Sequence, residues 1–165
     1  MTRGTLEQVG ARWRLRFRRE LAHAPGRVWR ALTEADDLAA WFPDGVRGEW
    51  RVGARLTFGS THVGTFLGEV LRCEPPVLLE YTWGTDVLRW EIEPTTAGCA
   101  LTLLDTFPEQ GKAARDGAGW HACLDALAAR LAGEGRVDTG AVWAMVHPDY
   151  VADFGTDAAS IGPPG

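Results

Sequence analysis

The amino-acid sequence predicts an α+β domain in which a curved, seven-stranded antiparallel sheet wraps around one long helix. Strand-like segments follow one another through most of the chain, and tight turn signals separate them, which is typical of antiparallel neighbours. One long amphipathic stretch, residues 113–132, comes after the last of these strands. The chain has 165 residues, about the length of one domain. Within one domain, such a helix buries its apolar side best against the concave face of a curling sheet.

The first predicted strand covers residues 12–21, which alternate between apolar and charged side chains. This alternation is typical of a half-buried antiparallel strand. We interpret the arginines as its solvated face rather than as an RNA-binding site, because a row on one strand does not line a groove. The two faces are Trp13, Leu15, Phe17 and Leu21 against Arg12, Arg14, Arg16, Arg18 and Glu20.

Two short helices are predicted between the first and second strands. Pro25 opens the first of them, since proline is tolerated in a first helical turn. A second short helix follows through Leu38 and Trp41 and ends at the turn signals of residues 43–45. Both helices are expected to close one end of the sheet.

Six further strands are predicted between residues 46 and 107, where glycine, proline and polar clusters mark the turns. Gly64 and Gly68 lie inside one of them and indicate a bulge or a close backbone approach, either of which curves a sheet. The six segments are 46–51, 55–60, 63–74, 77–84, 86–94 and 99–107.

The long helix is followed by a C-terminal extension. Gly133 has the position of a helix C-terminal cap. The extension carries an apolar patch, so we expect one or two short helical turns packed back on the domain, and a loose end after about residue 155. The chain then divides into an N-terminal arm (1–11), the main domain (12–133) and the extension (134–165).

Composition excludes several classes of protein. A net charge of −5 argues against general nucleic-acid binding, which needs a cationic face. No segment is apolar enough to span a membrane, and no secretory signal is visible. The three scattered cysteines (Cys73, Cys99 and Cys123) do not form a disulfide framework and fit a reducing compartment. We therefore expect a cytoplasmic protein.

Five short motifs occur in order along residues 12–132 and together resemble the group named after the Hsp90 ATPase activator homologue 1 (AHSA1-like), in the START-like helix-grip (SRPBCC) superfamily. The resemblance implies the helix-grip (START/Bet v 1-like) fold. The motifs are Pro25-x-x-Val28-Trp29-x-Ala31-Leu32-Thr33, Leu38-x-x-Trp41-Phe42-Pro43, Arg51-Val52-Gly53-x-Arg55-Leu56, Gly68-Glu69-Val70-Leu71 leading into Glu74-Pro75-Pro76-x-Leu78-x-x-Tyr81-Thr82-Trp83, and Gly119-Trp120-x-x-Cys123-Leu124-Asp125-x-Leu127.

The resemblance implies one fold but several different functions. Family members bind small apolar molecules, act as aromatases or cyclases in related groups, or contact a chaperone, and most bacterial single-domain members are uncharacterised. This sequence departs from the family in its last strand, where Cys99 and Asp105 stand in places that often hold Thr and His. Chemistry that depends on that His is not expected here.

Aromatic residues give the main indication of a ligand site. The chain has eight tryptophans, and strand parity directs several of them toward the long helix. They either line a cavity or fill the core, and the sequence leaves both open. The candidate ligand-binding residues are Trp41, Trp50, Phe58, Phe66, Tyr81, Trp83, Trp90, Leu103, Asp105, Trp120, His121 and Leu124.

Two residues are candidates for acid–base chemistry. Asp105 shares a strand face with apolar residues, and burial there would raise the pKa of its carboxyl. His121 is expected at the pocket mouth opposite Asp105. The alternative is that Asp105 makes a local hydrogen bond and His121 is partly solvated. Motifs for nucleophilic catalysis, phosphate binding and dinucleotide binding are missing, and His121 and Cys123 point to different helix faces, so we expect no cofactor and no metal.

Three functions follow from these observations. The first is non-enzymatic binding of a small hydrophobic, aromatic or lipid-like molecule between sheet and long helix, in a general ligand-binding or stress-type role. The second is a polyketide cyclase or aromatase-like enzyme that uses pocket shape and an acid or base. The third is a module that contacts an Hsp90-type chaperone through the face of Arg14, Arg16 and Arg18. The oligomeric state stays open, a homodimer included.

Overall fold

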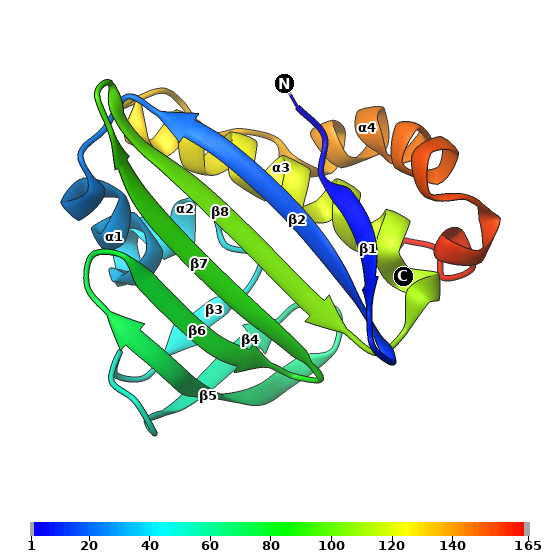
Figure 1. Ribbon diagram of the computed structural model, residues 1–165, viewed down its shortest axis with the longest axis horizontal. Coiled ribbons are helices and arrows are strands. Elements are labelled where there is room, and N and C mark those ends of the chain that lie inside the picture. The colour runs from blue at the N-terminus through cyan, green and yellow to red at the C-terminus, as the bar shows by residue number, and fades with distance from the viewer. Residues whose placement is uncertain (1, 164–165) are drawn as a thin grey trace.

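One antiparallel sheet of eight strands curves around the long helix α3 in the computed structural model, which describes residues 2–163 (Figure 1). The strands follow the order β1-β2-β8-β7-β6-β5-β4-β3 across the sheet. They are β1 (Thr5–Val9), β2 (Arg12–Leu21), β3 (Gly45–Arg47), β4 (Arg55–Ser60), β5 (Gly64–Glu74), β6 (Leu78–Trp83), β7 (Asp86–Thr95) and β8 (Gly98–Phe107).

Helices cover the concave side and both ends of this sheet. The short helices α1 and α2 lie together at one end, and α4 packs against α3 on the side of the β1 edge (Figure 1). The helices are α1 (Pro25–Thr33), α2 (Ala35–Trp41), α3 (Ala113–Leu131) and α4 (Thr139–Phe154), with single 3-10 turns η1 (Gln110–Lys112) and η2 (Thr156–Ala159). In the part of the chain described, no helix combines the length and the apolar character needed to cross a membrane.

The predicted fold class is confirmed, and the predicted number of strands is corrected from seven to eight. The additional strand is β1, which lies in the stretch expected to be an arm. It pairs with β2 over five residues, from Thr5 opposite Arg16 to Val9 opposite Arg12. Its residues are mostly exposed, because β1 is an edge strand. Few apolar side chains are therefore needed in β1. For this reason its sequence shows little alternation between apolar and polar residues.

The glycines of β5 allow the sheet to bend, as the sequence indicated. A side chain at Gly68 would overlap the carbonyl oxygen of Thr82 on β6 and the ring of Phe58 on β4. The pairing of β5 with β6 shifts register between Val70 and Arg72, which is a bulge or a similar irregularity. The sheet curls at this place, and its β3–β4 end comes round toward α2.

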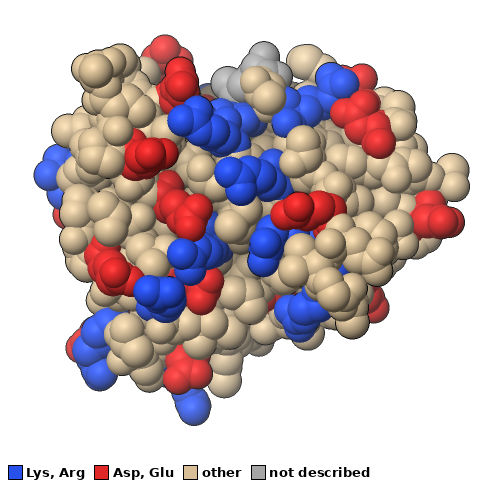
Figure 2. Space-filling model, viewed as in Figure 1, with Lys and Arg blue, Asp and Glu red and all other residues tan. Residues whose placement is uncertain are grey.

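The arginines of β2 lie on the convex face of the sheet, among acidic side chains (Figure 2). Arg14 lies 3.8 Å from Glu7, and Arg18 lies 3.2 Å from Glu20. The same face carries Arg89 of β7, which pairs with Glu80 and Glu91. Positive and negative charges thus alternate on this face, which agrees with its interpretation as a solvated surface.

A buried carboxylate joins the three helices of the core. Asp37 of α2 accepts hydrogen bonds from Arg27 of α1, both at 3.2 Å, and from Arg130 of α3 at 2.8 Å. Burial alone would raise the pKa of Asp37, but the hydrogen bonds and charges of Arg130 and Arg27 lower it in net. Asp37 therefore stabilises the packing of α1 and α2 on α3 as a carboxylate.

Replacing Asp37 with asparagine is expected to lower the free energy of unfolding by about 1–2 kcal/mol at neutral pH, because charge-assisted hydrogen bonds are lost. The loss is limited to this size because Arg27 and Arg130 are partly exposed. The native pKa is lowered, so this contribution is present above the unfolded-state pKa and is lost as pH falls through the native value. Urea denaturation of both proteins at several pH values measures it. A difference that grows toward low pH would contradict this assignment.

The C-terminal extension is more ordered than the sequence suggested. It forms the single helix α4 of 16 residues, rather than one or two short turns, and the side chain of Asp138 caps its N-terminus. Beyond residue 155, where a loose end was expected, Ala158 is fully buried and the amide of Ile161 donates to the carbonyl of Gly111. The extension is therefore tied to the start of α3.

Candidate functional site

The space between the sheet and the first half of α3 is filled by aromatic rings in mutual contact. Trp120 of α3 lies at the centre, with ring centroids 5.3 Å from Trp83, 5.8 Å from Trp90 and 5.8 Å from Phe42. The contacts continue ring by ring to Phe58 on β4 and Phe66 on β5, so aromatic side chains fill this part of the interior. The remaining members of this aromatic cluster are Trp41, Trp50, Phe58, Phe66 and Tyr81.

Each indole N–H of the cluster has a hydrogen-bond acceptor. Trp41 and Trp50 donate to backbone carbonyls of α1, at 2.8 and 2.7 Å. Trp83 donates to Asp44 at 2.8 Å, Trp90 to the hydroxyl of Tyr81 at 3.1 Å, and Trp120 to Asp105 at 2.9 Å. Buried indoles need such partners, so the rings are held in fixed orientations.

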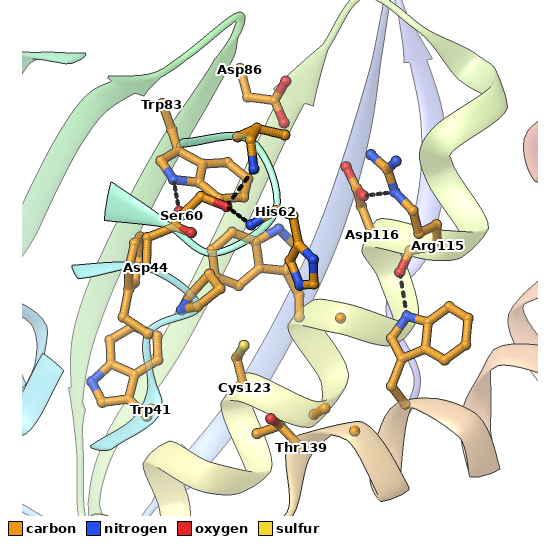
Figure 3. A pocket seen from close by; sticks show the side chains of 18 of the residues that line it. Trp41, Asp44, Ser60, His62, Trp83, Asp86, Arg115, Asp116, Cys123 and Thr139 are labelled. Atoms are coloured by element: carbon orange, nitrogen blue, oxygen red, sulfur yellow. Dashed lines mark hydrogen bonds and ion pairs between the residues drawn. The ribbon is translucent and has the colours of Figure 1, made fainter. Parts of the chain in front are cut away.

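A cleft opens where the cluster reaches the surface, between α2, the turns β4–β5 and β6–β7, the first half of α3 and the start of α4 (Figure 3). Its volume is about 820 Å³, within the range of roughly 300–1,000 Å³ that is typical of small-molecule sites. Its floor is aromatic: Trp41, Phe42 and Trp120 are nearly buried within it, and Phe66 and Trp83 are its partly exposed side chains. An apolar ring system could lie flat on these side chains.

One end of the cleft is polar and lies at the β4–β5 turn (Figure 3). Ser60 accepts hydrogen bonds from the backbone amides of His62 and Val63, which fixes the turn. Asp44, beside it, accepts from the indole of Trp83, and burial raises the pKa of its carboxyl in net. These groups offer hydrogen bonds to a ligand lying on the floor.

The opposite end carries a network of charges from β7, η1 and α3. Lys112 donates to both carboxylate oxygens of Asp86, at 2.7 and 2.8 Å, and lies 3.2 Å from Asp116. Arg115 donates to Asp116 at 2.8 Å. Burial alone would lower the pKa of Lys112, but Asp116 and Asp86 raise it in net, so Lys112 is a cation. Lys112 is thus held between two carboxylates of the network.

Asp105 lies directly behind this network, at the centre of the sheet and fully buried. Its Oδ2 accepts the indole N–H of Trp120. Its Oδ1 has no hydrogen-bond partner among the described residues. Burial, together with the charges of Asp86 and Asp116, raises the pKa of Asp105 well above its ordinary value. A protonated Asp105 would donate to Asp86 and satisfy that second oxygen.

The carboxyl oxygens of Asp86, Asp105 and Asp116 lie within 4.8 Å of one another, as ligands of a cation would. Lys112 already supplies a cation to two of them. With Asp105 protonated, two carboxylates face two cations, Lys112 and Arg115, and the network is neutral. We therefore interpret the cluster as a balanced ion-pair network rather than as a metal centre.

Four of the twelve candidate residues line the cleft: Trp41, Phe66, Trp83 and Trp120. The other eight lie outside its lining. Trp50, Phe58, Tyr81, Trp90, Leu103 and Leu124 pack in the core around it, and Asp105 is covered by Trp120. His121 points to the other side of α3, where its Nδ1 lies 2.8 Å from the hydroxyl of Tyr150. Asp105 and His121 thus lie apart, and neither faces the cleft.

Several residues of the cleft were not among the candidates, and some carried a signal. Asp86 has the same strand parity as Leu88 and Trp90, so its inward direction was readable from the sequence. Lys112 and Asp116 have the spacing of a helical ion pair. Asp44 and Arg115 carried no such signal, because loop and helix-face positions depend on packing. Cys123 also lines the cleft, but burial raises the pKa of its thiol to about 12, so it is a poor nucleophile.

The extension supplies one wall of the cleft. Arg136 and Val137 of the α3–α4 loop and Thr139, Gly140 and Trp143 of α4 belong to its lining. Trp143 is anchored by a hydrogen bond from its indole to the carbonyl of Arg115 on α3, at 3.0 Å. The site is therefore formed jointly by the sheet, the short helices and the extension.

Comparisons with known proteins agree with this architecture. The family model of activator of Hsp90 ATPase homolog 1-like proteins matches residues 22–132. Among solved structures, the conserved protein of unknown function EF2215 from Enterococcus faecalis is 19% identical with a TM-score of 0.73, and the match covers 92% of each chain. CalU16 from Micromonospora echinospora is 21% identical with a TM-score of 0.69, over 92% of this chain and 95% of that chain. No curated protein matches the sequence.

The neighbours differ in how much of this chain they match. Matches over 92% of the chain, as with EF2215 and CalU16, must reach into residues 134–165. MLL2253 from Mesorhizobium loti is 26% identical with a TM-score of 0.64, and it matches only 73% of this chain although 96% of its own length is covered. A chain can therefore have the central fold without a counterpart of every element found here.

Proposed function

This chain belongs to the family of activator of Hsp90 ATPase homolog 1-like proteins, and from that premise we propose that it binds a small, largely apolar molecule in the cleft beside α3. The observation that carries the proposal is the aromatic floor, whose rings are fixed by hydrogen bonds and open to a space of about 820 Å³. A preformed apolar surface with polar groups at both ends is typical of small-molecule sites.

The cyclase-like alternative loses support, because the two residues that the sequence predicted as its acid or base do not line the cleft. Asp105 lies behind Trp120, and His121 faces α4. The chaperone-contacting alternative depended on the arginines of β2, and acidic neighbours offset the charge of Arg14 and Arg18. Binding without catalysis is therefore the function that the geometry supports best.

The proposal predicts saturable binding of a neutral apolar probe such as N-phenyl-1-naphthylamine. It also predicts that Gly119→Leu weakens this binding at least about tenfold, because Gly119 lines the cleft and a Cβ built there meets no atom within 4 Å. A leucine at this position would occupy the space above the floor. Probe fluorescence, titrated against the folded protein, measures both effects.

Gly119→Ala is the matched control for this test. A glycine inside a helix costs about 1 kcal/mol relative to alanine, so both variants should be as stable as the wild type or more stable. The alanine variant should keep its probe affinity within about threefold, since one methyl group fills little of the cleft. Failure of the wild type to bind the probe, or equal binding by Gly119→Leu, would contradict the proposed function.

A further inference from the structure

The charges that line the cleft are not all paired. Of its three acidic residues, Asp86 and Asp116 are bound by Lys112 and Arg115, and Asp44 accepts the indole N–H of Trp83. The acidic side chains therefore already have donors. A cationic ligand would have to compete with Lys112 for its place in this network.

The basic side chains of the cleft keep free hydrogen-bond donors. Arg115 uses only its Nε, toward Asp116, and its two terminal nitrogens have no protein partner within the described residues. Arg136 is exposed in the α3–α4 loop and forms no ion pair with any residue described. Because Asp86 and Asp116 balance Lys112 and Arg115, the guanidinium group of Arg136 holds the unpartnered positive charge of the cleft.

The two ends of the cleft offer different hydrogen-bonding groups. Asp44 and Ser60 lie at one end and Arg115 at the other, with the aromatic floor between them (Figure 3). Guanidinium groups bind carboxylates and other oxyanions through paired N–H donors. An anion on the floor would therefore place its acidic group beside Arg136, the guanidinium group of the cleft whose charge no described carboxylate offsets.

We propose, resting on the function proposed above, that the ligand is a planar aromatic molecule with one acidic group, whose rings lie on the aromatic floor and whose anionic group is bound by Arg136. The family match ends at residue 132, so Arg136 comes from the extension. The extension then has a role in ligand selection as well as in closing one wall.

Two probes that differ by one sulfonate test this inference. 8-Anilinonaphthalene-1-sulfonate has the ring system of N-phenyl-1-naphthylamine plus an anionic group. The wild type is expected to bind the sulfonate about five- to tenfold more tightly, and the two probes should compete for one site. The preference should decrease with rising salt, because Arg136 is exposed to solvent.

Arg136→Gln should remove most of the preference for the sulfonate and leave the neutral probe unaffected. Arg30→Gln, an exposed arginine of α1 outside the cleft, is the control and should keep the full preference. If the neutral probe does not bind, the proposed function fails. If it binds and the sulfonate has no advantage, or Arg136→Gln keeps the advantage, the inference about the anion is overturned while the proposed function stands.

Discussion

Replacing Trp90 with alanine is expected to lower the free energy of unfolding by about 3–5 kcal/mol, the range found when large buried aromatic residues are truncated. Trp90 is 1% exposed and lies between Trp41 and Trp120, with ring centroids 5.4 and 5.8 Å away. Its indole N–H also satisfies the buried hydroxyl of Tyr81. The substitution removes all of these contacts at once, and urea denaturation measures the loss.

Trp90→Phe separates packing from hydrogen bonding. It keeps an aromatic ring between the two neighbouring tryptophans but leaves Tyr81 without its donor, so a smaller loss of about 1–3 kcal/mol is expected. If Trp90→Ala cost less than this phenylalanine variant, or less than about 1 kcal/mol, the ring would not be part of a filled core. That result would favour a cavity behind the cleft.

The tryptophans illustrate what the sequence could predict and what it could not. Strand parity and helical spacing place Trp83, Trp90 and Trp120 on faces directed at one another, and the rings do meet. Whether such rings enclose a space or fill it depends on their tilts and on the curvature of the sheet. Neither is encoded in residue spacing. The cleft lies only where the cluster meets the surface, and Trp143 joins it from the extension.

The elements were predictable to different degrees for a physical reason. Strands that bury one face keep a strict alternation, so β2 and β7 were readable from the sequence. The edge strand β1 buries little and left a weak signal. Helix α4 was underestimated because Pro148 lies inside it and its apolar residues do not keep to one stripe.

The free energy of unfolding of Asp105→Asn, compared with that of the wild type, is expected to increase as pH rises. Burial and neighbouring carboxylates raise the native pKa of Asp105, so the folded state keeps a proton that the unfolded chain releases above about pH 4. The contribution of Asp105 is then fully present below the unfolded-state pKa and is lost as pH rises toward the native value. In that window each pH unit costs the wild type about 1.4 kcal/mol.

Asparagine has the shape of the protonated acid. Its amide oxygen can accept the indole N–H of Trp120, and its NH2 group can donate to Asp86, so the network is kept without a titrating proton. Urea denaturation at several pH values between 5 and 8 measures the difference between the two proteins. Asp37→Asn is the control of opposite sign, because its native pKa is lowered and the wild type should hold its advantage across this range. A constant difference between Asp105→Asn and the wild type would mean that Asp105 is ionised in the fold, and that the ion-pair network beside the cleft carries an excess negative charge.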